Sequence, residues 1–124
     1  MLRRFRKVLV VEDDPSLRKA LVEKIARSGY RVVEASDGAS VMSYVVTERP
    51  DGIVLDLILP GKDGMTILAS LRGPEVDSKV PVIVLTNLLG RSRLREEVEQ
   101  LNAYYFDKAS TSIEEVVATL ERLV

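Results

Sequence analysis

Three carboxylates follow two apolar segments of this 124-residue sequence. Glu12 and Asp13 come directly after the segment 8–11, and Asp56 comes directly after the segment 52–55. If these segments lie side by side, the carboxylates repel one another in a partly dry cleft. A divalent cation with oxygen ligands relieves that repulsion, and Mg²⁺ is such a cation. The pattern therefore predicts a magnesium site.

A hydroxyl and an ammonium group end two further apolar segments. Thr86 closes the segment 80–86, and Lys108 follows the segment 103–106. An aspartate such as Asp56 can attack phosphorus to give an acyl phosphate, provided that positive charge neutralises the phosphoryl oxygens. Lys108 and a bound cation would supply that charge, and Thr86 could donate a hydrogen bond. These residue types are compatible with phosphoryl transfer to Asp56.

The composition excludes several other kinds of chemistry. The sequence has no cysteine and no histidine, which removes disulfides, thiolate and imidazole metal ligands and His-dependent triads. A net charge of −1 argues against direct binding to nucleic acid. The start of the chain lacks the apolar core of a signal peptide, and no apolar run is long enough to span a membrane. We expect a cytoplasmic protein of one domain.

Strand and helix patterns alternate along the chain. Strands are predicted at 7–12, 31–35, 52–56, 80–86 and 103–106, and helices at 14–29, 37–49, 65–72, 94–101 and from 112. Because parallel strands need crossover helices, the pattern predicts a doubly wound α/β domain with a five-stranded parallel sheet and helices on both faces. In the flavodoxin-like order 2-1-3-4-5, the first and third strands are neighbours, and all carboxyl ends share one edge.

Local signals mark several boundaries of these elements. Asp14 before Pro15 is typical of a helix start, and Ser112 with Glu115 forms a capping-box pattern. Asn102, before the fifth strand, is a candidate for the left-handed backbone conformation.

Four segments together resemble the receiver domain of two-component response regulators. They are VLVVEDDP (8–15), DGIVLDLILPGKDG (51–64), PVIVLT (81–86) and FDKAS (106–110), which occur in the family's order and spacing. The resemblance covers nearly the whole chain and implies a single receiver domain over 1–124. Such a domain is either a stand-alone receiver of the chemotaxis type or a receiver cut from a longer regulator.

The resemblance assigns a role to each residue of the acidic cluster. It implies that Asp56 is the phosphoacceptor and that Glu12 and Asp13 are the magnesium pair. The backbone carbonyl of Ile58 would be a further magnesium ligand.

The resemblance also assigns the residues that respond to phosphorylation. The Thr86 hydroxyl would bond to the phosphoryl group and Lys108 would pair with it. Tyr105 occupies the position of the switch aromatic, which would swing inward when Thr86 moves. The alternative for Tyr105 is an aromatic residue half-buried in an edge strand.

The implied partners are proteins. A histidine kinase or histidine phosphotransfer protein would dock on the first helix, where Leu17, Ala20 and Leu21 are candidate contacts. The fourth helix, fifth strand and fifth helix would signal to a downstream protein target or a missing output domain, as a monomer or a phosphorylation-dependent dimer. The candidate residues of this face are Arg91, Arg93, Arg95, Tyr104 and Tyr105.

Four features depart from the family pattern. Asn87 and Ala109 stand where the family usually has a small residue and a proline, and Asn102 stands near a missing glycine. We expect a trans peptide bond before Ala109, because a cis bond there would cost about 3 kcal/mol. The resemblance implies that the positions of Ile58 and Leu88 flank the route of the hydrolytic water. Two aliphatic side chains there would not orient that water, which predicts slow loss of the phosphoryl group.

Two other classes of function stay open at this point. One is a magnesium-dependent phosphohydrolase with Asp56 as nucleophile, although such enzymes often need an acid where Ile58 stands. The other is a degenerate receiver that serves only as an interaction module, which Asn87 and Ala109 would favour.

Overall fold

The structure of the chain is a computed structural model that describes residues 5–74, 76, 79–87 and 93–124. Its strands are β1 (Lys7–Val11), β2 (Arg31–Ala35), β3 (Gly52–Leu55), β4 (Val82–Thr86) and β5 (Tyr104–Asp107). Its helices are α1 (Pro15–Arg27), α2 (Val41–Glu48), α3 (Gly64–Leu71), α4 (Leu94–Gln100) and α5 (Ile113–Leu123). All strand pairs are parallel, in the order β2-β1-β3-β4-β5. The predicted doubly wound fold is confirmed.

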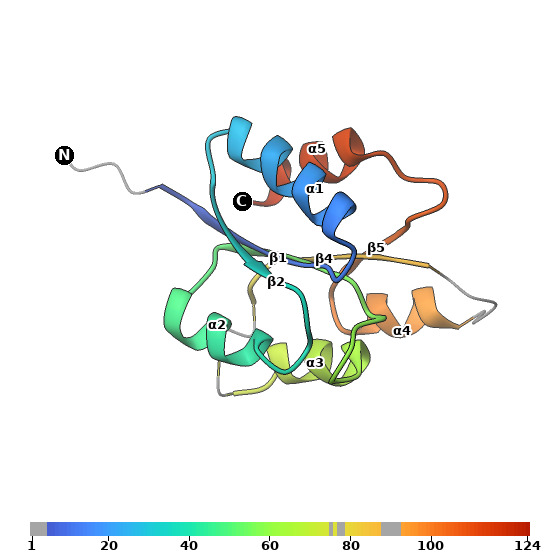
Figure 1. The fold of residues 1–124 in the computed structure, drawn as a ribbon. Helices are drawn as coiled ribbons and strands as arrows, with labels where there is room; N and C mark the ends of the chain where they lie inside the picture. The colour runs from blue at the N-terminus through green and yellow to red at the C-terminus, as the bar shows by residue number, and fades with distance from the viewer. Residues whose placement is uncertain (1–4, 75, 77–78, 88–92) are drawn as a thin grey trace.

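The sheet forms the middle of three layers. Helices α1 and α5 cover one face, and α2, α3 and α4 cover the other (Figure 1). Side chains of β1 alternate between the two cores, with Val8 and Val10 packed toward α1 and α5 and with Leu9 and Val11 in the opposite core. Burial on both faces explains why the inner strands are almost continuously apolar.

Several elements are shorter than the sequence pattern predicts. Strands β1 and β3 each end one residue early, so that Glu12 and Asp56 lie just beyond the strands. Helix α2 starts at Val41 because the preceding residues form a turn, in which Asp37 Oδ1 accepts hydrogen bonds from Ser40 N at 3.0 Å and Ser40 Oγ at 3.1 Å. These shifts leave the topology unchanged.

The predicted helix starts and the left-handed residue are confirmed. The Asp14 side chain accepts a hydrogen bond from Ser16 N at 3.2 Å at the start of α1. At α5, Ser112 Oγ accepts from Glu115 N at 3.1 Å, and Glu115 Oε1 accepts from Ser112 N at 3.3 Å. Asn102 has a φ of 56°. No helix among the described residues is long and apolar enough to cross a membrane.

A close backbone contact fixes the loop that follows Asp56. Gly64 N donates a hydrogen bond to Leu57 O at 3.2 Å, and a Cβ atom at Gly64 would lie 2.3 Å from Leu57 Cα. Gly61 turns the same loop with a φ of +92°, which glycine adopts at little cost. The loop therefore returns to the sheet and starts α3 directly beside the segment that carries Asp56.

Candidate functional site

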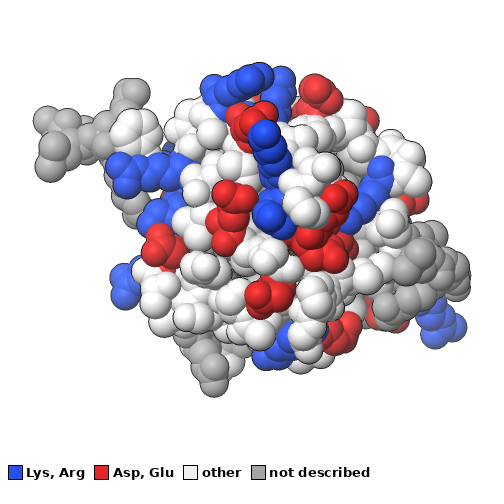
Figure 2. Space-filling view, viewed as in Figure 1, with Lys and Arg blue, Asp and Glu red and all other residues white. Residues whose placement is uncertain are grey.

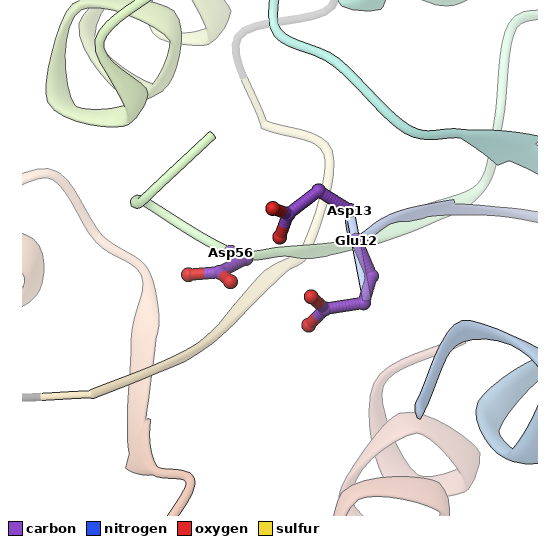
Figure 3. Close-up of side chains that lie close together, drawn as sticks. All are labelled: Glu12, Asp13 and Asp56. Carbon is purple, nitrogen blue, oxygen red and sulfur yellow. The ribbon is translucent and has the colours of Figure 1, made fainter. Parts of the chain in front are cut away.

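Three carboxylates converge at the carboxyl ends of β1 and β3. These strands are neighbours, and Val11 is paired with Leu55, so the residues that follow them, Glu12 and Asp56, lie side by side. One oxygen each of Glu12, Asp13 and Asp56 lie within 4.8 Å of one another. Glu12 is 1% exposed and Asp56 is 3% exposed, whereas Asp13 is exposed. Figure 3 shows the three side chains directed into the same space.

Asp56 receives hydrogen bonds on both of its carboxylate oxygens. Oδ1 accepts from Thr86 Oγ1 at 2.7 Å and from the backbone N of Ile58 at 3.0 Å. Oδ2 accepts from Lys108 Nζ at 2.6 Å. Since Thr86 ends β4 and Lys108 follows β5, the sheet brings together side chains that are far apart in the sequence. Donors to an ionised carboxylate stabilise its charged form.

Lys108 also pairs with Glu12. Its Nζ lies 2.8 Å from Glu12 Oε1, while Glu12 Oε2 accepts a hydrogen bond from Asp14 N at 3.0 Å. Burial raises the pKa of Glu12, and the hydrogen bonds from Lys108 and Asp14 only partly oppose this effect. Burial by itself would lower the pKa of Lys108, but its hydrogen bonds to Asp56 and Glu12 outweigh burial and raise that pKa.

The donor set fits a divalent cation with oxygen ligands. Three ionised carboxylates and one ammonium group leave two negative charges without compensation. The Asp13 carboxylate accepts no hydrogen bond from the part of the chain that the structure describes, so its oxygens are open to a ligand. Figure 2 shows acidic side chains gathered beside the start of α1, with basic ones next to them. Mg²⁺ prefers sites of this kind, which supply a few carboxylate oxygens and leave room for water.

The other predicted site residues lie close to this cluster or on the neighbouring face. The Ile58 side chain is 46% exposed, and its amide is bound to Asp56. Tyr105 is only 8% exposed, with its ring 5.2 Å from the Arg95 guanidinium carbon. Tyr104 is 45% exposed on the same strand.

Several remaining predictions can be placed as well. Leu21, a candidate docking residue, is buried in the core beneath α1 and is unable to contact a partner. Asn87 is exposed at the end of β4. The Lys108–Ala109 peptide bond is trans, as expected, because no cis peptide bond occurs in the described ranges. Leu88 and Arg91 lie outside the described residues.

Sequence reasoning missed Arg18, which contacts the backbone of the acidic pair. Its Nη1 donates a hydrogen bond to Glu12 O at 2.9 Å and lies 3.5 Å from Asp13 O. The available signal was a basic residue one turn into the helix that follows the two acids, a spacing that helix geometry can direct back to the loop.

Comparison with known proteins agrees with this geometry. The model of the response regulator receiver domain matches residues 8–121. The response regulator MprA of Mycobacterium tuberculosis is 33% identical over 120 residues, which are 95% of this chain and 50% of that protein. The chain thus spans about half the length of the curated relatives that it matches across most of its own length.

Solved structures show the same fold. The receiver domain of Francisella response regulator 1452 matches with a TM-score of 0.84 and 28% identity, over 95% of both chains. The chemotaxis response regulator CheY4 of Vibrio cholerae matches with a TM-score of 0.84 over 98% of this chain and 100% of its own; at 24% identity, this match supports the fold alone. The arrangement of the acidic cluster agrees with the family match over residues 8–121. This chain belongs to the response regulator receiver domains of two-component signalling.

Proposed function

We propose that this chain accepts a phosphoryl group on Asp56 from a histidine kinase or a histidine phosphotransfer protein, in a reaction that needs Mg²⁺. The observation that carries the proposal is the set of donors around Asp56. A buried carboxylate contacts a hydroxyl at 2.7 Å, an ammonium group at 2.6 Å and a backbone amide at 3.0 Å. These groups can neutralise the charge of a phosphoryl group that arrives at the same place.

In the proposed transfer, a carboxylate oxygen of Asp56 attacks phosphorus while the bond from phosphorus to the donor's imidazole nitrogen breaks. The electron pair of the broken bond stays on that nitrogen, and the product is an acyl phosphate. The added phosphoryl oxygens compete for the Thr86 hydroxyl and the Lys108 ammonium, which now bond to Asp56 itself. Both side chains are therefore expected to transfer their contacts from the carboxylate to the phosphoryl group.

Glu12, Asp13 and Asp56, with the carbonyl of Ile58, are the proposed magnesium ligands. A bound Mg²⁺ would neutralise charge on the phosphoryl oxygens and on the acidic cluster. The buried Glu12 carboxylate is held by Lys108 and by the Asp14 amide, whereas the exposed Asp13 carboxylate has free oxygens. Beside Asp56, the cluster thus has a carboxylate held in place, that of Glu12, and an accessible carboxylate, that of Asp13.

The proposed output is a change on the face formed by α4, β5 and α5. A phosphoryl group adds roughly 1.5 to 2 negative charges that pull on Thr86 and Lys108, at the ends of β4 and β5. Tyr105 is paired with Val84 of β4, two residues before Thr86, and its ring packs beneath Arg95 of α4. This position makes Tyr105 the proposed switch residue. A downstream protein or an output domain would bind the changed face.

The chain is proposed to promote only its own phosphorylation and a slow loss of the phosphoryl group. Apolar Ile58 stands beside the phosphoacceptor and offers no group that could orient water. We further propose that 1–124 is one receiver domain that acts in the cytoplasm, as a monomer or a dimer that forms on phosphorylation.

Intact mass after incubation with acetyl phosphate tests this proposal. With Mg²⁺ the protein should gain one phosphoryl group, and the gain should vanish with EDTA or in Asp56→Asn. Asparagine keeps the shape of Asp56 but supplies no carboxylate nucleophile. A folded protein that binds Mg²⁺ and gains no mass would overturn the proposal and favour an interaction module.

A further inference from the structure

We infer that Arg18 is a positioning residue that sets the orientation of the acidic pair for the cation, an inference that rests on the proposed magnesium site. Arg18 lies in the first turns of α1, directly above the loop that joins β1 to this helix. Its guanidinium contacts the backbone of both acids, and among the described residues it has no hydrogen bond or ion pair with Asp56, Thr86 or Lys108.

The carbonyls of Glu12 and Asp13 lie beyond the end of the β1 ladder. The β1 ladder ends when Glu12 N donates to Ala35 O at 3.0 Å, so no neighbouring strand continues beyond this point to accept or donate. Arg18 Nη1 instead donates a hydrogen bond to Glu12 O at 2.9 Å and lies 3.5 Å from Asp13 O. The guanidinium thereby replaces the missing strand as the partner of the loop backbone.

Arg18 is itself held by a residue of another strand. Its Nε lies 3.3 Å from Glu34 Oε1, on β2 at the position paired with Val10. The planar guanidinium can hold a carboxylate with one nitrogen and a carbonyl with another, at a fixed angle. Lysine has one donor nitrogen and is unable to reproduce this arrangement.

The backbone that Arg18 contacts carries the two carboxylates of the loop. The peptide units that Arg18 holds carry Glu12, whose side chain turns inward to Lys108, and Asp13, whose side chain stays exposed and faces the same space. Rotation of these peptide units would move the carboxylates apart. Arg18 is therefore expected to act on cation affinity, whereas the contacts of Asp56 with Thr86 and Lys108 do not depend on it.

Simple electrostatics predicts the opposite effect, which makes the inference testable. A positive charge near the acidic pair repels a cation, so its removal should tighten Mg²⁺ binding if charge alone matters. If positioning matters, removal should weaken binding, as loss of outer-shell partners of metal ligands commonly does.

The experiment measures Mg²⁺ affinity by isothermal titration calorimetry in Arg18→Met, with Arg18→Lys, Glu34→Gln and Arg27→Met alongside. Arg27 is an exposed basic residue at the far end of α1 and controls for the loss of one positive charge. We expect Arg18→Met to raise the dissociation constant roughly 10-fold. Lysine should restore affinity only in part, Glu34→Gln should weaken it less, and Arg27→Met should leave it unchanged.

A second readout separates affinity from chemistry. The initial rate of phosphorylation by acetyl phosphate, measured against Mg²⁺ concentration, should show a raised half-saturation point and an almost unchanged maximum for Arg18→Met. Unchanged or tighter Mg²⁺ binding in both Arg18 variants would overturn the inference, and Arg18→Lys decides the matter if Arg18→Met fails to fold. Failure of the wild-type protein to bind Mg²⁺ would instead overturn the proposed function.

Discussion

Each end of the sheet holds a long cationic side chain that joins several elements. At the carboxyl ends of the strands, Lys108 Nζ lies 2.6 Å from Asp56 Oδ2 and 2.8 Å from Glu12 Oε1. Near the amino ends of β4 and β5, Arg72 donates hydrogen bonds to three backbone carbonyls of the described residues. Its acceptors are Leu101 O at 2.7 Å, Val80 O at 2.7 Å and Asn102 O at 3.1 Å.

The two cations differ in what they neutralise. The acceptors of Arg72 among the described residues are neutral carbonyls, so these contacts hold the loop between α4 and β5. The acceptors of Lys108 are the carboxylates of Glu12 and Asp56, which repel each other. Together with Asp13 the cluster has three negative charges, and Lys108 compensates only one of them. A cationic side chain thus stabilises the fold at one end of the sheet. At the other end a cationic side chain leaves negative charge uncompensated, where the magnesium and phosphoryl site is proposed.

Replacement of Lys108 should have the largest effect. In Lys108→Met, the rate of phosphorylation by acetyl phosphate should fall roughly 100-fold, because one donor to the developing phosphoryl charge is lost. Lys108→Arg retains the charge and should lose less. Mass spectrometry at saturating Mg²⁺ measures both rates, and a Lys108→Met rate within twofold of wild type would contradict the role given to Lys108.

Replacement of Arg72 should lower stability without changing the chemistry. In Arg72→Met, the free energy of unfolding should fall by about 3 kcal/mol, because backbone carbonyls in two partly buried contacts and one exposed contact lose a charged donor. Urea denaturation measures this change, and Arg72→Lys should restore part of it. The phosphorylation rate of the folded variant should match wild type; a rate that falls with stability would show that the two ends of the sheet are coupled.

The sequence was sufficient to predict the fold and the convergence of the acidic cluster. Both follow from local patterns, because apolar segments alternate with helical periodicity and the polar residues come where the apolar segments end. Parallel topology then places the residues after Val11 and Leu55 at one edge, and the observed pairing of Val11 with Leu55 agrees with this. An error of one residue in a strand end, as at β1, does not affect this argument.

Contacts of long side chains between elements could not be predicted in this way. Arg18 lies on α1 and Arg72 is the C-cap residue of α3, and the sequence neighbourhoods of both resemble those of solvated arginines. Whether each reaches a backbone carbonyl depends on the rotation of its helix and on the path of a distant loop. Arg72 meets Leu101 and Asn102 only because α3 and the end of α4 lie together in the folded chain.

Tyr105 shows a third case, a buried hydroxyl that has no hydrogen-bond partner in the part of the chain that the structure describes. The sequence suggested a half-buried aromatic residue as one alternative, but β5 is covered by α4, and the Tyr105 side chain is 8% exposed. Its hydroxyl is the single buried side-chain oxygen or nitrogen in the described ranges without a hydrogen bond. Unlike the Lys108 and Arg72 contacts, this hydroxyl is expected to reduce stability.

Tyr105→Phe should therefore be more stable than wild type by about 1 kcal/mol at pH 7, since it removes a buried hydroxyl without a partner. Burial raises the pKa of Tyr105, the Asp107 carboxylate adds to this effect, and Arg95 opposes it. The folded protein holds the phenolic proton more tightly than the unfolded chain does. The stability that this proton contributes is present below the ordinary pKa of 10.0 and is lost as the pH rises through the folded pKa.

The advantage of Tyr105→Phe over wild type should consequently grow at alkaline pH. Urea denaturation at neutral pH and again above the ordinary tyrosine pKa measures this growth. Tyr104→Phe is the matched control, because Tyr104 is the exposed neighbour on the same strand and should change stability little at either pH. A Tyr105→Phe variant that is less stable than wild type would show that the hydroxyl has a hydrogen-bond partner in solution, such as water. The Tyr105 hydroxyl would then stabilise the fold, as the polar contacts of Lys108 and Arg72 do.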